Sequence, residues 1–127
     1  MKEENKIILY QDDNEITRVS VRFADEDLWL TQNQLADIYQ TSKSNVSEHI
    51  KHIFEDGELD KTVVVRNFRI TTQHGAMEGK TQSRDVAHYN LDMIIALGYR
   101  VQSQVATRFR RWATQRLHEY IQKGFAM

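Results

Sequence analysis

The sequence predicts an α+β fold: a winged helix-turn-helix-like unit with a small N-terminal antiparallel hairpin and a long C-terminal amphipathic helix. Three observations predict it. Residues 31–54 have the spacing of two short helices joined by a turn, residues 62–89 form two β-rich stretches around a glycine-containing loop, and residues 104–122 repeat apolar side chains at helical spacing. A chain of 127 residues fits one domain, so we expect residues 1–127 to form a single unit.

The composition is that of an ordinary globular protein, with 40% apolar and 28% charged residues. Cysteine is absent, which excludes disulfides, thiolate zinc sites and a cysteine nucleophile. The first 15 residues are polar and acidic, unlike a signal peptide, and the longest apolar run, residues 93–97, is too short to cross a bilayer. We therefore expect a soluble cytoplasmic protein.

The formal net charge of −1 conceals two unequal halves. Residues 1–60 hold 6 Lys+Arg and 14 Asp+Glu, a charge of −8, whereas residues 61–127 hold 11 and 4, a charge of +7. This asymmetry predicts that a polyanion meets the second half of the chain. The alternative is that the two halves neutralise each other across an interface.

Three short strands are predicted before the first helix. Residues 7–10 are apolar, residues 17–23 alternate between apolar and polar side chains, and residues 28–30 are again apolar. The alternation places Thr17, Val19, Val21 and Phe23 on one face of a half-buried hairpin, and Arg18, Ser20 and Arg22 on the other.

Residues 31–54 carry the signals of two capped helices. Thr31 is a predicted N-cap and Gln34, three residues later, completes a capping box, while Ser42 is placed to cap the second helix. Ala36 supplies the small residue that a close helix crossing needs. Gln40 departs from the pattern, because this turn position is most often glycine.

After these helices, residues 62–89 are predicted to form a wing-like hairpin, with a glycine-containing loop between its strands. Asn90 is then placed to cap a helix over residues 91–97. That helix is apolar on all sides except at Asp92, which predicts a buried element, and Gly98 is expected to end it.

The final helix, residues 104–122, is predicted to carry one apolar stripe, formed by Val105, Phe109, Trp112, Tyr120 and Ile121. Arg116 falls near the centre of this stripe. We expect it to stack on Trp112 or Tyr120 and to pair with an acid such as Asp92, because a buried guanidinium needs such partners. The alternative is that the stripe is an exposed dimer or partner surface, where Arg116 contacts the other chain.

If the second helix lies in the major groove of double-stranded DNA, its first turns face the base edges. The predicted base-reading residues are Lys43, Ser44, Asn45, Ser47 and Glu48. Residues 31–54 net zero charge, so most of the affinity must come from phosphate contacts elsewhere. The predicted phosphate contacts are Thr31, Ser42, Lys51, Arg66, Arg69, Lys80 and Arg84.

Three stretches together closely resemble the RhuM-like family of bacterial virulence-associated proteins, over about residues 7–125. They are WLTQNQLADIYQTSKSNVSEHIKHIFEDGEL, VVVRNFR and YNLDMIIALGYRVQSQVATRFRRWATQRLHEYIQKGF. The resemblance implies a DNA-binding protein of pathogenicity-island or prophage-like origin whose function is unsettled, and a longer protein of which this chain is the N-terminal domain. The FRRW segment at residues 109–112 also resembles, more distantly, phage antirepressor N-terminal domains.

Other chemistries are weakly supported. His49 and His52 have a spacing that can share a metal, but no third ligand follows at a suitable spacing, so we expect no metal and no cofactor. Neither a nucleophile elbow nor a phosphate-binding glycine loop is present, so an enzyme is not expected. Two hypotheses remain: sequence-specific DNA binding, as a homodimer through the C-terminal helix, or an antirepressor-type module that binds another regulator.

Overall fold

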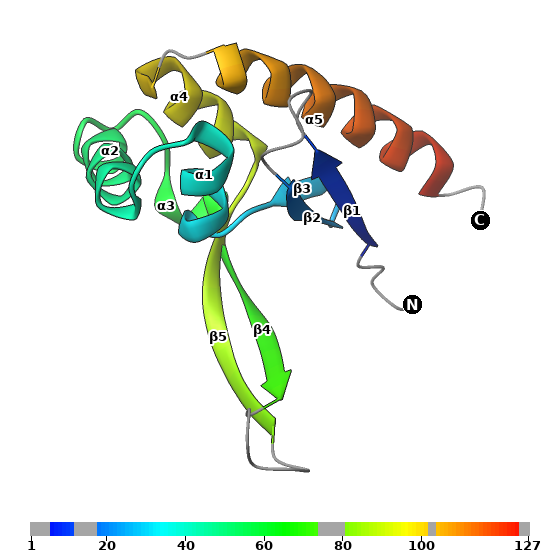
Figure 1. Ribbon diagram of the computed structural model, residues 1–127. Coiled ribbons are helices and arrows are strands. Elements are labelled where there is room, and N and C mark those ends of the chain that lie inside the picture. The colour runs from blue at the N-terminus through cyan, green and yellow to red at the C-terminus, as the bar shows by residue number, and fades with distance from the viewer. Residues whose placement is uncertain (1–5, 12–17, 74–80, 102–103, 125–127) are drawn as a thin grey trace.

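The computed structural model describes residues 6–11, 18–73, 81–101 and 104–124, and shows a mixed α+β arrangement (Figure 1). Strands β1 (Lys6–Gln11), β2 (Arg18–Ala24) and β3 (Asp27–Trp29) form an antiparallel sheet in that order. Helices α1 (Gln32–Tyr39), α2 (Lys43–Glu55) and α3 (Lys61–Val64) follow. A hairpin of β4 (Val65–Gln73) and β5 (Thr81–Tyr89) leads into α4 (Leu91–Val101) and α5 (Gln104–Gly124).

The N-terminal sheet has the predicted alternation. Val19, Val21 and Phe23 are buried, and the register pairs Ile8 with Val21 and Phe23 with Leu28. Thr17 lies outside the described residues. Between β2 and β3 the chain turns tightly through Asp25 and Glu26, which both have positive φ values, 55° and 60°.

Both predicted N-caps of the helix pair are confirmed. The Thr31 side chain accepts a hydrogen bond from the Gln34 backbone N–H, and the Gln34 side chain reciprocates, while Ser42 caps α2 through the Asn45 N–H. Gln40 takes the left-handed conformation, with φ 55° and ψ 50°, so the turn keeps the geometry that usually selects glycine. Its backbone N–H donates to the carbonyls of Ala36 and Asp37 in the last turn of α1.

The hairpin projects away from the helices, on the side opposite α5 (Figure 1). It begins later than predicted. Val63 and Val64 were expected in a strand, but they lie in the short helix α3, because Asp60 caps it by accepting from the Thr62 N–H. The hairpin is joined to the rest of the fold at Leu30. The Leu30 N–H donates to the Tyr89 carbonyl at 3.0 Å, and the Tyr89 N–H donates to the Leu30 carbonyl at 2.7 Å. The loop was predicted over residues 74–84. Its last part is wrong, because residues 81–84 belong to β5, and residues 74–80 lie outside the described residues.

The predicted end of the helix at residue 97 is wrong. Helix α4 continues through Gly98 to Val101. Gly98 serves a close approach instead, since a Cβ added there would lie 3.3 Å from the Tyr39 hydroxyl and 3.4 Å from the Ala106 Cβ. Burial is also one-sided rather than complete: Met93, Ile94 and Leu97 are buried, whereas other residues of α4 are partly exposed.

Helix α5 covers the N-terminal sheet with aromatic side chains. The Phe109 ring lies 4.9 Å from Tyr10 and 5.7 Å from Trp112, and Phe23 contacts Trp112 and Tyr120. The expectation for Arg116 is wrong. Its side chain is 42% exposed and pairs with Glu119 at 3.0 Å rather than with Asp92, because the fully buried stripe runs through Phe109 and Ala113 instead. Among the described helices, none has the length and apolarity that crossing a bilayer requires.

Candidate nucleic-acid interface

Helix α2 turns one polar face outward. Val46, Ile50 and Ile53 are buried and anchor the helix against the core. Five exposed residues occupy the rest of its first turns: Lys43, Ser44, Asn45, Ser47 and Glu48. They are the predicted base-reading residues, so the structure brings them together on the surface. Four of them have side chains no longer than glutamate, which lets another molecule approach the helix closely.

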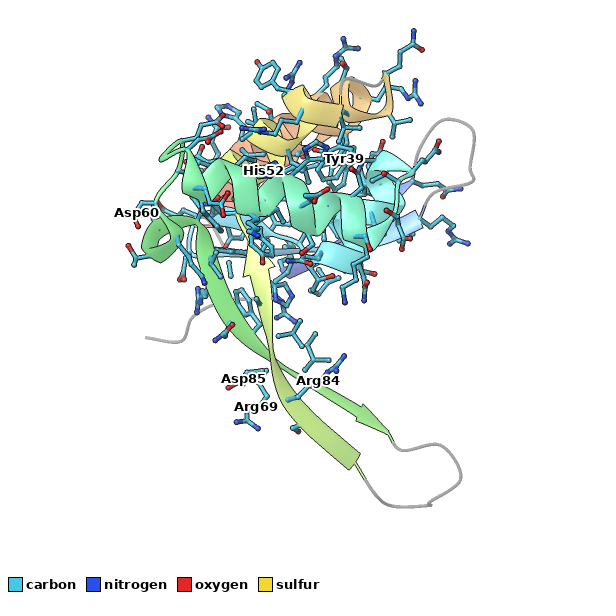
Figure 2. The ribbon with its side chains drawn as sticks, turned by 90° about the vertical axis from the view of Figure 1, so that its left-hand side faces the viewer. Tyr39, His52, Asp60, Arg69, Arg84 and Asp85 are labelled. Carbon is cyan, nitrogen blue, oxygen red and sulfur yellow. The ribbon has the colours of Figure 1, made fainter. Side chains whose placement is uncertain are left out.

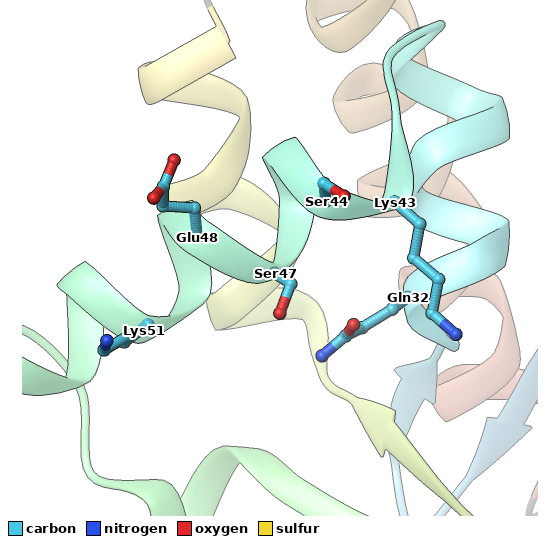
Figure 3. A pocket seen from close by; sticks show the side chains of 6 residues that line it. All are labelled: Gln32, Lys43, Ser44, Ser47, Glu48 and Lys51. Atoms are coloured by element: carbon cyan, nitrogen blue, oxygen red, sulfur yellow. The ribbon is translucent and has the colours of Figure 1, made fainter.

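A shallow hollow of about 440 Å³ lies along this face (Figure 3). We call it the helix hollow. It is lined by Gln32, Lys43, Ser44, Ser47, Glu48 and Lys51. In the close-up, Lys43 and Gln32 lie at one end of this face, and Glu48 points away from them. Lys51 also approaches Glu55, at 4.0 Å, but both side chains are more than half exposed, so this pair is weak.

Two predicted contacts serve the turn rather than the helix hollow. The Asn45 side-chain amide donates to the Thr41 hydroxyl at 2.8 Å, and the Ser42 hydroxyl accepts from the Asn45 backbone N–H at 3.0 Å. Asn45 is not part of the lining of the helix hollow. These bonds fix the start of α2.

A second hollow, of about 280 Å³, lies between the helix pair and the hairpin. We call it the junction hollow. It is lined by Thr31, Gln32, Asn33, Lys43, Arg84, Asp85, Val86, Ala87 and Tyr89. Gln32 and Lys43 line both hollows, so the surface runs without a break from α2 to β5.

The hairpin carries two cationic side chains near this surface: Arg84, which lines the junction hollow, and Arg69 on the neighbouring strand. Figure 2 shows Arg69 and Arg84, with Asp85, on the part that projects away from α2. Arg69 approaches Asp85 at 3.8 Å, with both side chains more than half exposed, and Arg84 is exposed. Lys80 lies outside the described residues.

Arg66 has a different environment from the other predicted phosphate contacts. It forms an ion pair with Asp25, and its guanidinium lies over the Phe68 ring at 4.5 Å and near the Trp29 ring at 6.0 Å. Arg22 lies over the Phe68 ring as well, at 4.7 Å. Arg66 therefore fastens the base of the hairpin to the N-terminal sheet, and its side chain is only 32% exposed.

The acidic and basic halves of the chain do neutralise each other in part. Asp25 meets Arg66, and Arg100 meets Asp56 at 3.3 Å and Glu58 at 3.0 Å. None of these five residues lines either hollow. The cations that line the hollows, Lys43, Lys51 and Arg84, are thus not the ones engaged in these interactions between the two halves.

Gln32 and Tyr89 are not among the residues that the sequence predicts for this surface. The Gln32 side-chain amide donates to the Tyr89 hydroxyl at 2.9 Å, which joins α1 to β5 at the floor of the junction hollow. Tyr89 is only 7% exposed. No local signal marks this pair, because the two residues are 57 positions apart in the chain.

Two titratable groups lie close to this region: Asp27, which is partly buried, and His88, which is buried. Asp27 accepts from the backbone N–H groups of Leu28 and Leu91 and from the Asn90 amide, so it ties the start of α4 to β3. Burial raises the pKa of Asp27 above its usual value. His88, beside the Phe68 ring at 4.9 Å, contacts the Val86 carbonyl through Nδ1, and burial lowers the pKa of His88 below 6.5.

His88 makes the stability of the fold depend on pH. The unfolded chain takes up the histidine proton at a higher pH than the folded protein does, so this contribution is complete above pH 6.5 and is lost as the pH falls below it. We expect His88→Asn to flatten the dependence of the unfolding midpoint on pH in that range, measured by urea denaturation. His118→Asn, at an exposed position, should keep the wild-type dependence. An unchanged dependence in His88→Asn would contradict this assignment.

Metal binding finds no support at α2. His49 is partly buried and His52 exposed, and in the part of the chain that the structure describes no group of three or more His, Cys, Asp and Glu residues is arranged to hold a metal ion.

Taken together, the structure is that of a mixed α+β domain with a projecting hairpin and an exposed polar helix. A sequence profile of the Virulence protein RhuM family matches residues 63–127, which is more than half of the chain. The chain belongs to the RhuM virulence protein family. The matched residues cover the hairpin, α4 and α5, whereas α1 and α2 precede them. No curated protein and no solved structure matches the chain.

Proposed function

We propose that this protein is a sequence-specific DNA-binding regulator without enzymatic activity, which reads the major groove with α2. The observation that carries the proposal is the continuous concave surface made by the helix hollow and the junction hollow. It joins the exposed polar face of α2 to a cationic hairpin, and Gln32 and Lys43 belong to both parts.

The arrangement of elements supports a winged helix-turn-helix. A short first helix, a tight turn with left-handed Gln40 and a longer second helix are followed by a projecting antiparallel hairpin. The bridge between Leu30 and Tyr89 pairs the hairpin with the segment that precedes α1. In such units the second helix enters the major groove, and its first turns meet the base edges.

In this proposal the two tasks of DNA binding are divided. Ser44, Ser47 and Glu48 read base edges, because hydroxyls contact either base of a pair and a carboxylate accepts from the amino group of cytosine. Phosphates are held by Arg69, Arg84 and Lys51, whose side chains are exposed. The division explains how a helix pair without net charge takes part in DNA binding.

The alternative, an antirepressor-type module that binds another regulator, predicts that the second helix is covered by its own chain. The exposed face of α2 argues for DNA reading instead. A palindromic target with half-sites about one helical turn apart would indicate that the protein binds DNA as a homodimer.

Selection from random DNA duplexes tests the proposal. The wild-type protein is expected to enrich one motif, and the double variant Ser44→Ala and Ser47→Ala to lose enrichment at the bases these residues read, while still binding DNA. Ser20→Ala, at an exposed position on β2, is the matched control and should select the wild-type motif. If wild-type protein enriches no motif, sequence-specific reading is refuted.

A further inference from the structure

We infer that the junction hollow binds one DNA phosphate, which Gln32, Tyr89, Lys43 and Arg84 hold together. We call it the phosphate site. The inference rests on the proposed function and adds a specific anion site to it. The site lies between the two parts that DNA must engage at once, the reading helix and the hairpin. It also assigns to Lys43 a role at the sugar-phosphate backbone rather than at a base edge.

The floor of the junction hollow offers two hydrogen-bond donors. The Tyr89 hydroxyl accepts from the Gln32 side-chain amide at 2.9 Å, so its own proton is left to donate to another group. The Gln32 amide has a second N–H besides the one it gives to Tyr89. Because Tyr89 is only 7% exposed, its hydroxyl is held in place rather than free to turn with a mobile side chain.

The rim of the hollow carries two cations from different elements, Lys43 at the start of α2 and Arg84 on β5. Within the described residues, neither has an ion-pair partner. Asp85 also lines the hollow, so that two cations stand against one carboxylate. The balance at the rim is therefore positive, as a phosphate requires.

A single phosphate fits this chemistry better than a base does. Two cations and two N–H or O–H donors converge from two sides of one hollow, which matches an anion with several acceptor oxygens. A bound phosphate would also bridge α1 and β5, and so fix the angle between the reading helix and the hairpin. The phosphate site would then set the register of α2 on the DNA.

The test measures binding to the selected duplex with one phosphate at a time replaced by an uncharged methylphosphonate. For the wild-type protein, one replacement at the junction hollow should weaken binding about tenfold, the size of one charge-assisted hydrogen-bonded contact. With Tyr89→Phe, which removes only the hydroxyl, and with Gln32→Ala, the loss at that one phosphate should shrink to about threefold or less, while the losses at other phosphates stay the same.

Two matched controls accompany the variants. Tyr99→Phe, 63% exposed on α4, and Gln122→Ala, exposed on α5, should give the wild-type profile. Thermal melting of each variant checks that Tyr89→Phe and Gln32→Ala are folded at the temperature of the assay.

The possible outcomes distinguish a failure of the phosphate site from a failure of the proposed function. Both variants could weaken binding but leave the loss of affinity at each replaced phosphate unchanged. The Gln32–Tyr89 pair would then only stabilise the fold, and the phosphate site would be refuted, while DNA reading by α2 stands. The same holds if the variants change nothing. If the wild-type protein binds no duplex, both proposals fail.

Discussion

Phe109→Ala is expected to lower the free energy of unfolding by about 3–5 kcal/mol, the usual range for removing a large buried aromatic side chain. The Phe109 side chain has no exposed surface and packs between Tyr10 of β1 and Trp112 of its own helix. Its loss leaves a cavity where α5 meets the N-terminal sheet. Urea denaturation followed by circular dichroism measures the change.

Arg111→Ala, at an exposed position two residues further along the same helix, is the control and should change the free energy by no more than about 0.5 kcal/mol. A change below about 1 kcal/mol for Phe109→Ala would show that α5 is not packed as described, since truncating a buried phenylalanine to alanine usually costs about 3 kcal/mol or more.

Reversing the charge at both cations of the junction hollow, with Lys43→Glu and Arg84→Glu, is expected to weaken binding to all duplexes by at least about 100-fold at moderate salt. Each lost phosphate contact removes roughly one released counterion, worth about tenfold in affinity at 0.1 M salt. The slope of log affinity against log salt should become shallower by the amount that about two lost phosphate contacts remove. Fluorescence anisotropy over a salt series measures both quantities.

The control makes the same change of net charge elsewhere. Lys61 and Arg111 are exposed residues outside both hollows. The double variant Lys61→Glu and Arg111→Glu should keep most of the affinity and the full dependence of the affinity on salt. If the control loses as much as the test variant, overall charge decides the binding, and the hollows have no special part in it.

The sequence predicts the parts of this fold that depend on local signals. Thr31 and Ser42 could be assigned as caps because a cap bonds to N–H groups two or three residues away, within reach of a short pattern. The burial of Val19, Val21 and Phe23 follows from alternation in the same way. The RhuM resemblance was predicted over about residues 7–125, and the family match confirms it over residues 63–127.

The errors arise where tertiary contacts decide. Gly98 has the sequence signal of a helix end, yet it lies inside α4, where a Cβ would make tight contacts with the Tyr39 hydroxyl at 3.3 Å and the Ala106 Cβ at 3.4 Å. Arg116 looked buried because an ideal apolar stripe was extended along the whole of α5, whereas its fully buried part follows Phe109 and Ala113. Neither Tyr39 nor the N-terminal sheet is near these residues in the sequence.

The candidate site divides in the same way. The face of α2 could be predicted, because helical spacing separates Ser44, Ser47 and Glu48 from the buried Val46 and Ile50. The junction hollow could not, since it exists only where the first turn of α1 meets β5. Similarly, nothing in the sequence marks Arg66 as the partner of Asp25 rather than as an exposed cation.

DNA reading by α2 is tested most directly by NMR, by following the backbone amide shifts as the selected duplex is added. We expect the largest shifts at Ser44, Ser47 and Glu48 and at Arg84 and Asp85 of the hairpin, and no change on the exposed face of α5 around Arg111 and His118. Shifts concentrated on α5, with α2 unaffected, would contradict DNA reading by α2.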